Sequence, residues 1–338
     1  MICARAPYRV SLLGGGTDYD QYISEYGYGS VLSFAINKHC SVVVSPQPID
    51  TSGIKYTISY RQVEKCISVE DITHQAVKKS LQRFRVGSTQ IHCIGELQAG
   101  NGMGSSSAFL CALFRALERY RGFEPKSADD LAFAVHRFEI ESLEECVGRQ
   151  DVCASSFGGV NIFEFDKFKF VKREPLLMNR DFVDQFESSF LLVKAGVTRS
   201  ASDVAARAVP KIIDPISRNS LQSLSELPRL GALAILKEDL RELGALMRQA
   251  WDHKLSVSGD LIPGDIIQLI DFGLQKGALA GRLLGAGGGG YVLFFVEPEL
   301  QQKFLSDMQF DLPPQRFQIQ TEGASVVFDS TNKCSSRA

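Results

Sequence analysis

The sequence lacks a surplus of charge of either sign and lacks any long uncharged hydrophobic run. Its 37 Lys and Arg residues nearly balance its 39 Asp and Glu residues, so the formal net charge is only -2. No overall electrostatic field therefore favours nucleic acid or an anionic membrane as a partner. The chain offers no apolar window long enough for a membrane span and no secretory signal at its start. We expect a cytoplasmic protein that binds a small molecule, with an oligomeric state that the sequence leaves open.

Paired cysteines and clustered histidines are lacking as well. The eight cysteines are scattered singly, without a C-x-x-C pair, which excludes the usual zinc-site spacing and favours reduced, buried thiols. The five histidines show no pairing that indicates metal or triad chemistry. What is present is a chain of 338 residues, 44% hydrophobic and 22% charged, which is typical of a folded globular protein of one large or two medium domains.

Hydrophobic periodicity predicts mainly sheet in the first ninety residues and interleaved strands and helices in the second half, an α+β organisation. A Pro-containing stretch at 172–179 is the expected domain boundary, which divides the chain into domains at 1–180 and 181–338. Strands are expected at residues 10–13, 31–34, 41–45, 56–60, 90–94, 160–165, 188–193, 279–284 and 291–296 and near 317 and 326, and helices at 109–117, 127–145, 230–255, 263–276 and from 298.

A stretch of glycine and serine precedes the predicted helix at 109–117. Glycines let backbone N–H groups approach phosphate oxygens, a helix N-terminus adds partial positive charge, and a hydroxyl can reach a magnesium ion. Taken alone, the stretch is equally a flexible loop with a serine cap, and it is not a Walker A loop because no Gly-Lys-Ser/Thr follows. The candidate phosphate ligands are Gly100, Gly102, Gly104, Ser105, Ser106 and Ser107.

Three segments, taken together and in order, resemble the three motifs of the GHMP kinases, the superfamily of galactokinase, homoserine kinase, mevalonate kinase and phosphomevalonate kinase. They are residues 6–18, which end in Gly-Gly-Gly-Thr-Asp, the Gly-Met-Gly-Ser-Ser-Ser-Ala loop at 102–108, and the Gly-rich stretch at 283–290. Within the superfamily the sequence most resembles D-glycero-D-manno-heptose 7-phosphate kinases. The segments that carry this resemblance are residues 14–18, 148–151, 199–202 and 277–279.

The resemblance implies a two-domain fold with an N-terminal domain that contains a left-handed βαβ crossover, a ferredoxin-like C-terminal domain and a cleft between them. ATP would lie against the central loop of the N-terminal, ATP-binding domain. Gln98 and Met103 depart from the residues common in the superfamily at this loop, but neither change removes a ligand.

The resemblance also implies catalytic roles for Asp151 and Arg9. Asp151 follows a Gly-x-x turn that is similar to the segment carrying the catalytic aspartate in galactokinase and mevalonate kinase, so it would act as the general base. Arg9 would hold Asp151 and orient the acceptor hydroxyl. From the residues alone, Asp151 could instead cap the helix that follows, and Arg9 could be a surface arginine.

For Mg²⁺ the family implies one hydroxyl from the central loop and one glutamate upstream of Asp151. Ser106 matches the hydroxyl position. Glu139 and Glu141 fall on opposite flanks of the predicted helix, so only one of them can face the site, and the spacing found in the family favours Glu139. A partly hydrated Mg²⁺ needs few protein ligands, although either glutamate could be a solvated surface charge.

Sugar-binding residues are expected on both sides of the site. Thr17 and Asp18 occupy positions where related sugar kinases contact sugar hydroxyls, and Arg149 and Arg199 are the preferred donors to a substrate phosphate. An arginine in a loop can also pair with a nearby carboxylate or point into solvent. The full set of expected substrate contacts is Thr17, Asp18, Arg149, Arg199, Gly287, Gly288 and Gly289, with Thr198 and Ser200 as further candidates.

These resemblances together imply an ATP- and Mg²⁺-dependent kinase that phosphorylates the anomeric hydroxyl of D-glycero-D-manno-heptose 7-phosphate to the 1,7-bisphosphate. The product would supply nucleotide-activated heptose for surface polysaccharide biosynthesis. Two alternatives stay open from the sequence, namely an anomeric kinase of an unphosphorylated sugar such as fucose and a non-catalytic sugar sensor.

Overall fold

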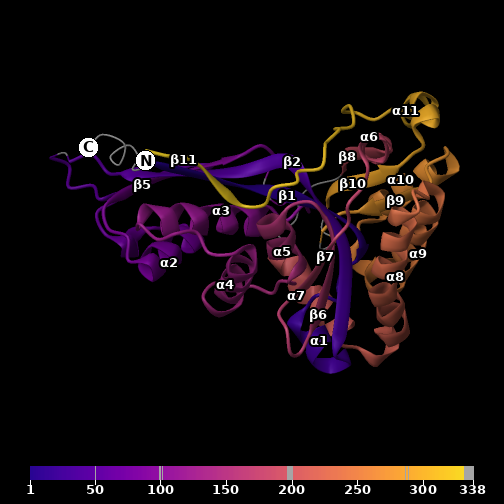
Figure 1. Cartoon of the computed structure of the whole chain (residues 1–338), viewed down its shortest axis with the longest axis horizontal. Coiled ribbons are helices and arrows are strands. Elements are labelled where there is room, and N and C mark those ends of the chain that lie inside the picture. Colours follow the sequence, from indigo (N-terminus) through magenta and orange to yellow (C-terminus); the bar gives the residue numbers. More distant parts are fainter. Residues whose placement is uncertain are drawn as a thin grey trace.

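A computed structural model describes residues 1–49, 51–98, 100, 102–195, 201–285, 287 and 289–330, with only the backbone of 201–203 and 205. Two sheets organise this part of the chain (Figure 1). The strands are β1 (Ile2–Gly14), β2 (Tyr28–Pro46), β3 (Tyr56–Ser59), β4 (Val63–Cys66), β5 (Thr89–Gly95), β6 (Val160–Asp166), β7 (Lys172–Pro175), β8 (Phe190–Ala195), β9 (Ala280–Leu283), β10 (Gly290–Phe295) and β11 (Ser325–Asp329). The α-helices are α1 (Asp20–Tyr26), α2 (Gln75–Phe84), α3 (Ser105–Tyr120), α4 (Ala128–Glu141), α5 (Gln150–Phe157), α6 (Arg180–Ser188), α7 (Ala201–Ile212), α8 (Arg218–Leu236), α9 (Leu240–Ser258), α10 (Gly264–Gln275) and α11 (Gln301–Met308).

The first sheet has eight strands in the order β11-β1-β2-β5-β3-β4, with β6 and β7 continuing from β2. Its pairings are antiparallel except for β3 with β5, which run parallel and are connected through β4 and α2. The sequence predicted two short strands at 31–34 and 41–45, whereas β2 is one continuous strand through both. Its first part pairs with β6 and its second part with β5, so a single strand borders two neighbours in turn.

Strand β1 is almost wholly buried because helices from both halves of the chain pack on it. Helices α3 and α5 contact it from the first half of the sequence, and α8 and α9 contact it from the second. Apolar side chains along both faces of β1 are therefore withdrawn from water, which is the principal driving force for joining the two halves. This placement puts the loop after β1 at the junction of the halves.

The second sheet has three antiparallel strands in the order β8-β10-β9, and a single bridge from Leu192 to Gln315 extends it beyond β8. Helices α8, α9 and α10 lie beside this sheet on the right of Figure 1. One mostly antiparallel sheet, one antiparallel sheet and the helices packed on them confirm the α+β class. Five phenylalanines from β2, α6, β8, β10 and the segment before β11 pack together where the sheets meet, at Phe34, Phe186, Phe190, Phe295 and Phe317.

Further differences from the sequence-based expectation lie in the second half of the chain. The helical region predicted at 230–255 is two helices, because Glu238 adopts a left-handed φ of 58° between α8 and α9. The strand expected near 317 is reduced to two isolated bridges, from Gln315 to Leu192 and from Ile319 to Ile36. Strand β11 pairs with β1, so the segment 181–338 also supplies an edge strand to the first sheet. Within the described residues no helix is long and apolar enough to cross a membrane.

Candidate active site

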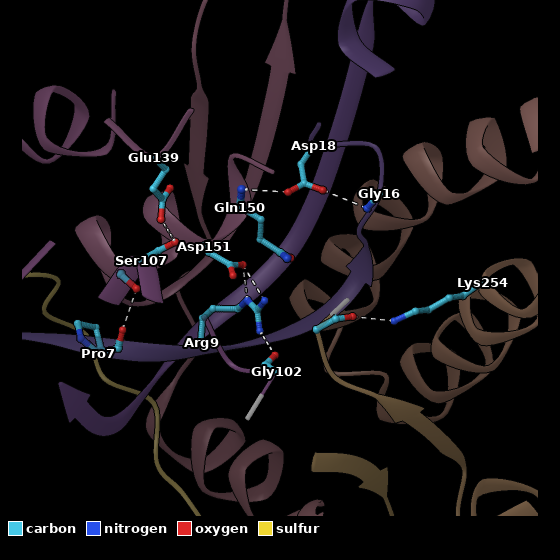
Figure 2. Close-up of polar contacts among 12 residues, drawn as sticks. Pro7, Arg9, Gly16, Asp18, Gly102, Ser107, Glu139, Gln150, Asp151 and Lys254 are labelled. Atoms are coloured by element: carbon cyan, nitrogen blue, oxygen red, sulfur yellow. Dashed lines mark hydrogen bonds and ion pairs between the residues drawn. The ribbon is translucent and has the colours of Figure 1, made fainter. Parts of the chain in front are cut away.

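The centre of the candidate site is an ion pair between β1 and α5. Arg9 contacts Oδ1 of Asp151 with both Nε and Nη2, each at 2.7 Å (Figure 2). Arg9 is buried, whereas the side chain of Asp151 keeps 30% of its surface exposed. The pairing that the sequence predicted is therefore present, with the second carboxylate oxygen of Asp151 left free of the guanidinium.

Asp151 also lies at the start of α3. Gly104 precedes that helix with a φ of +70°, and a Cβ built on Gly104 would lie 3.2 Å from Oδ2 of Asp151. Gly104 is the N-cap residue of α3 and makes no side-chain cap hydrogen bond, so the start of this helix lies beside the carboxylate without the cap that a Ser or Asp side chain would give. A helix N-terminus of this kind favours anions.

The central loop contacts the C-terminal glycine loop through backbone alone. Gly102 has a φ of +79°, and a Cβ on it would lie 2.4 Å from the Leu284 carbonyl oxygen. In return, a Cβ on Gly285 would lie 2.6 Å from Cα of Gly102. Arg9 donates from Nη1 to the Gly102 carbonyl at 2.5 Å and from its backbone N–H to the Met103 carbonyl at 3.1 Å. The three motifs, far apart in sequence, therefore meet at one point.

Glu139 of α4 faces the same region. It has no exposed surface, and its Oε1 accepts a hydrogen bond from Ser107 at 2.7 Å, while its Oε2 is buried without a hydrogen-bond partner. Burial raises the pKa of Glu139 well above its usual range, and the Ser107 hydrogen bond opposes that shift. Glu141 instead pairs with Arg137 on the exposed side of α4. The two glutamates therefore lie on different sides of α4, as their helical spacing predicts, and the metal role of Glu139 stays a prediction.

The contacts of the three central-loop serines differ from the expectation. Ser107, which was expected only among the phosphate ligands, is the serine that contacts Glu139, because its position on α3 points toward α4. Ser106 lies 100° further round the helix and is exposed. Ser105 accepts a hydrogen bond from the backbone N–H of Gly100 at 3.3 Å, which closes the loop onto its own helix. The metal role of Ser106 stays a prediction.

Thr17 and Asp18, the expected sugar contacts, make hydrogen bonds within the protein, and their substrate role stays a prediction. Thr17 has no exposed surface, and its hydroxyl donates to the Ser30 carbonyl at 3.0 Å. Asp18 is buried, and its two oxygens accept backbone N–H groups of Gly16 and Gln150 at 3.0 and 3.1 Å. Burial raises the pKa of Asp18, which the bond from Gln150 partly offsets. Thr17 therefore holds the loop after β1 against β2, and Asp18 holds it against α5.

Arg149 is likewise occupied within the protein. Its Nε donates to Asp20 Oδ1 at 2.7 Å, its Nη1 donates to the Phe170 carbonyl at 2.9 Å, and the guanidinium stacks 5.1 Å from the Phe170 ring centre. His136 contacts the other oxygen of Asp20 at 3.2 Å. Pairing with a neighbouring carboxylate was the alternative role considered for this arginine, and that pairing is present in the structure. A contact between Arg149 and a substrate phosphate stays a prediction.

The other expected substrate contacts are only partly described. Gly287 and Gly289 are buried, with φ values of 115° and 112°, which is backbone that glycine adopts without strain. Thr198, Arg199, Ser200 and Gly288 lie outside the described residues. Their substrate roles stay predictions from the sequence.

Two cations at the site were not indicated by any sequence motif. Lys254 of α9 donates to the carbonyls of Leu283 and Gly285 at 3.3 and 3.0 Å, and the latter bond is drawn in Figure 2. Arg282 of β9 is buried and donates to the Leu12 carbonyl. Arg282 lies three residues before Gly285 in the sequence, but no spacing rule links α9 to the glycine loops, so only the folded arrangement reveals Lys254.

Comparison with known proteins agrees with this arrangement. Residues 71–159 match the N-terminal domain model of the GHMP kinases, and residues 232–313 match the C-terminal model. The chain is 25% identical to D-glycero-alpha-D-manno-heptose 7-phosphate kinase of Campylobacter jejuni, over 88% of this chain and 90% of that one. It is also 25% identical to galactokinase of Thermococcus kodakarensis, over 86% and 88%.

A similar solved structure is a D-glycero-D-manno-heptose 1-phosphate kinase from Bacteroides thetaiotaomicron, with a TM-score of 0.74, 23% identity, and coverage of 97% of this chain and 99% of that one. This similarity shows that the two proteins share the fold. The family matches and the meeting of three glycine-rich segments around Arg9 and Asp151 point to the same conclusion. The chain belongs to the GHMP kinase superfamily and is a sugar kinase, a phosphotransferase that uses ATP to phosphorylate a sugar hydroxyl.

Proposed function

We propose that this kinase transfers the γ-phosphoryl group of ATP to the anomeric hydroxyl of D-glycero-D-manno-heptose 7-phosphate and forms the 1,7-bisphosphate. The observation that carries the proposal is the position of Asp151, whose one oxygen is fixed by Arg9 and whose other oxygen lies beside the start of α3. The choice of sugar is supported by the similarity to the heptose 7-phosphate kinase of Campylobacter jejuni.

Asp151 would act as the general base. Arg9 fixes Oδ1 with two nitrogens, so Oδ2 is the oxygen available to accept the proton of the attacking hydroxyl. A base must approach the hydroxyl within about 2.6–3.2 Å. Because Arg9 has its own position fixed by the Gly102 and Met103 carbonyls, the carboxylate is held ready for that approach.

The phosphates of ATP would lie between Asp151 and the central loop. Backbone N–H groups in the first turn of α3, together with those of Gly102 and Gly104, would present donors where the transferred group carries negative charge, whereas the N–H of Gly100 already donates to Ser105. Phosphoryl transfer depends mainly on such positioning and charge stabilisation, with little covalent work for the protein. Close contact of Gly102 with Leu284 and Gly285 brings the C-terminal half to the same phosphates.

The residues present also fit Mg²⁺. Oε2 of Glu139 is buried without a hydrogen-bond partner, and carboxylate oxygens are ligands that Mg²⁺ prefers. The exposed Ser106 lies on α3, one residue before the serine that contacts Glu139. Ser107 would keep Glu139 oriented from behind through Oε1. When bound, Mg²⁺ would neutralise charge on the phosphates.

A kinase of an unphosphorylated sugar is the second candidate. The observation in its favour is that Arg149, one of two arginines expected to bind a substrate phosphate, pairs with Asp20 instead. Arg199 then carries the expected phosphate contact alone among the preferred arginines.

The test is ADP release measured with a panel of sugars, each with and without its terminal phosphate. Release with heptose 7-phosphate at a specificity constant well above that for heptose supports the proposal. Equal use of both sugars would instead establish the second candidate. Absence of release with every sugar, despite nucleotide binding, would indicate a sugar sensor and overturn both kinase assignments.

A further inference from the structure

Lys254 stands behind the C-terminal glycine loop. The lysine lies on α9, is partly buried, and gives two of its three N–H donors to the carbonyls of Leu283 and Gly285. Gly285 in turn touches Gly102 of the central loop, whose carbonyl accepts from Arg9. A continuous chain of contacts therefore connects Lys254 to the residue that fixes the candidate base.

The surroundings of Lys254 carry a surplus of positive charge. Among the described residues, the charged groups that act on it are Arg282 from β9 and Arg9 from β1. Of the other elements packed on α9, α7 and the turn after α9 provide Lys211 and Asp260, which pair with each other, and α8 meets α9 through the hydroxyls of Ser220 and Ser256.

Arg9 is already paired with Asp151, but within the described residues neither Lys254 nor Arg282 forms an ion pair with a carboxylate. Two cations that are withdrawn from water repel each other unless an anion is bound. Burial, followed by the charges of Arg282 and Arg9, lowers the pKa of Lys254 to about 7. Burial and Arg9 lower the pKa of Arg282 to about 10, and Nε of that arginine is buried without a hydrogen-bond partner. A bound anion would therefore stabilise the charged forms of both Lys254 and Arg282.

We propose that Lys254 is a positioning residue of the kinase reaction, which in its charged form holds the C-terminal glycine loop against the central loop and stabilises a bound phosphate there. The inference rests on the proposed function. The shared chemistry of the ligand is a phosphate group, which either the nucleotide or the sugar 7-phosphate can supply. Phosphate binding would favour the ammonium form, so the protein would take up a proton when it binds.

The experiment is calorimetric titration of the full chain with ADP and Mg²⁺, and separately with heptose 7-phosphate, in buffers of different ionisation enthalpy. At pH 8 Lys254 is mostly neutral before binding, so we expect uptake of roughly 0.5–1 proton in one arm, and little at pH 6 where it is already charged. The arm that shows uptake identifies the phosphate concerned.

Lys254→Met should abolish that uptake and reduce turnover. Lys254→Arg carries a permanent charge, so it should also abolish the uptake while restoring turnover to within about tenfold of wild type. Lys237→Met, at an exposed lysine, should match wild type in both measurements. If Lys254→Met takes up as many protons as wild type, or if Lys254→Arg is as inactive as Lys254→Met, the inference is wrong. Failure of the wild type to bind ADP would instead overturn the kinase assignment itself.

Discussion

Arg9 binds a single oxygen of Asp151, with Nε and Nη2 both 2.7 Å from Oδ1. Replacing Asp151 with asparagine keeps an oxygen for Arg9 but removes the base. We expect Asp151→Asn to fold and bind ATP while turnover falls by roughly 100-fold or more, the scale of a lost general base. Steady-state kinetics and thermal unfolding check this.

The control for that substitution is Asp184→Asn, which removes an exposed carboxylate of α6 and should leave turnover unchanged. Near-normal turnover in well-folded Asp151→Asn would remove Asp151 from the chemistry.

The two glutamates of α4 provide a matched pair for the metal. Glu139→Gln should raise the Mg²⁺ concentration for half-maximal rate by roughly tenfold or more, because the orphaned Oε2 loses its charge. Glu141→Gln should leave the requirement unchanged, because Glu141 pairs with Arg137 at the surface. A larger effect from Glu141→Gln would contradict the assignment.

Substitutions of Ser106 and Ser107 distinguish a role in Mg²⁺ binding from a role in stability. Ser106→Ala should raise the Mg²⁺ requirement with little change in stability, because the side chain is exposed. Ser107→Ala should lower the free energy of unfolding by about 1–3 kcal/mol, because it leaves buried Glu139 without its partner. Chemical denaturation measures the second effect, and equal stability of the two variants would refute the division.

Substitution of Arg149 and Arg199 tests whether the enzyme recognises the 7-phosphate of its substrate. Removing the 7-phosphate should lower the wild-type specificity constant by about 1,000-fold, several kcal/mol of transition-state binding. Arg199→Ala should reduce the difference between the specificity constants for the two sugars, because it weakens binding of the phosphorylated sugar only. Arg149→Ala should instead lower the melting temperature and leave that difference unchanged, because its guanidinium is paired with Asp20. If Arg149→Ala alone reduced the difference, the pair of Arg149 and Asp20 would have to open for the substrate.

Backbone contact between the glycine loops is testable with one methyl group. Gly102→Ala would place a Cβ 2.4 Å from the Leu284 carbonyl, so the loops must separate, and we expect at least a tenfold loss of turnover from misplaced phosphates. Gly122→Ala has the same positive φ but no neighbour within 4 Å. It should lose about 1–2 kcal/mol of stability and keep full turnover.

Asp20 predicts an acid-sensitive contribution to stability. Burial alone would raise its pKa, but the hydrogen bond and charge of His136, followed by the charge of Arg149, lower it to about 2. A depressed folded-state pKa gives stability that is present above about pH 4 and is lost as the pH falls toward 2.

The measurement is denaturant unfolding of Asp20→Asn and wild type at pH 6 and pH 2.5. The destabilisation should be clearly smaller at pH 2.5, whereas Asp271→Asn, at an exposed position, should have little effect at either pH. An equal loss at both values would show that charge is not what Asp20 contributes.

The sequence was sufficient for the parts of the site that depend on local chemistry. Glycine spacing predicted a loop before α3, and helical phase predicted that Glu139 and Glu141 diverge, because both follow from local chain geometry. It was insufficient where a distant element decides the outcome. Thr17 and Asp18 are enclosed by partners from β2 and α5, and Lys254 reaches the site from a helix with no motif.

The fold shows the same division. Strands with alternating or continuous apolar residues could be predicted, but β2 exceeded its two predicted pieces because β6 and β5 pair with it in succession. Neither the break between α8 and α9 nor the return of β11 to β1 has a local signal, since Glu238 and the last strand take their conformations from tertiary packing.

The return of β11 has a consequence for biosynthesis. Until residues 325–329 are synthesised, one edge of β1 has unpaired N–H and C=O groups. Strand β1 is made long before β11, so this edge of the sheet stays open while the intervening residues are synthesised. An exposed edge of this kind invites pairing with other chains, so loss of β11 by truncation should favour aggregation over folding.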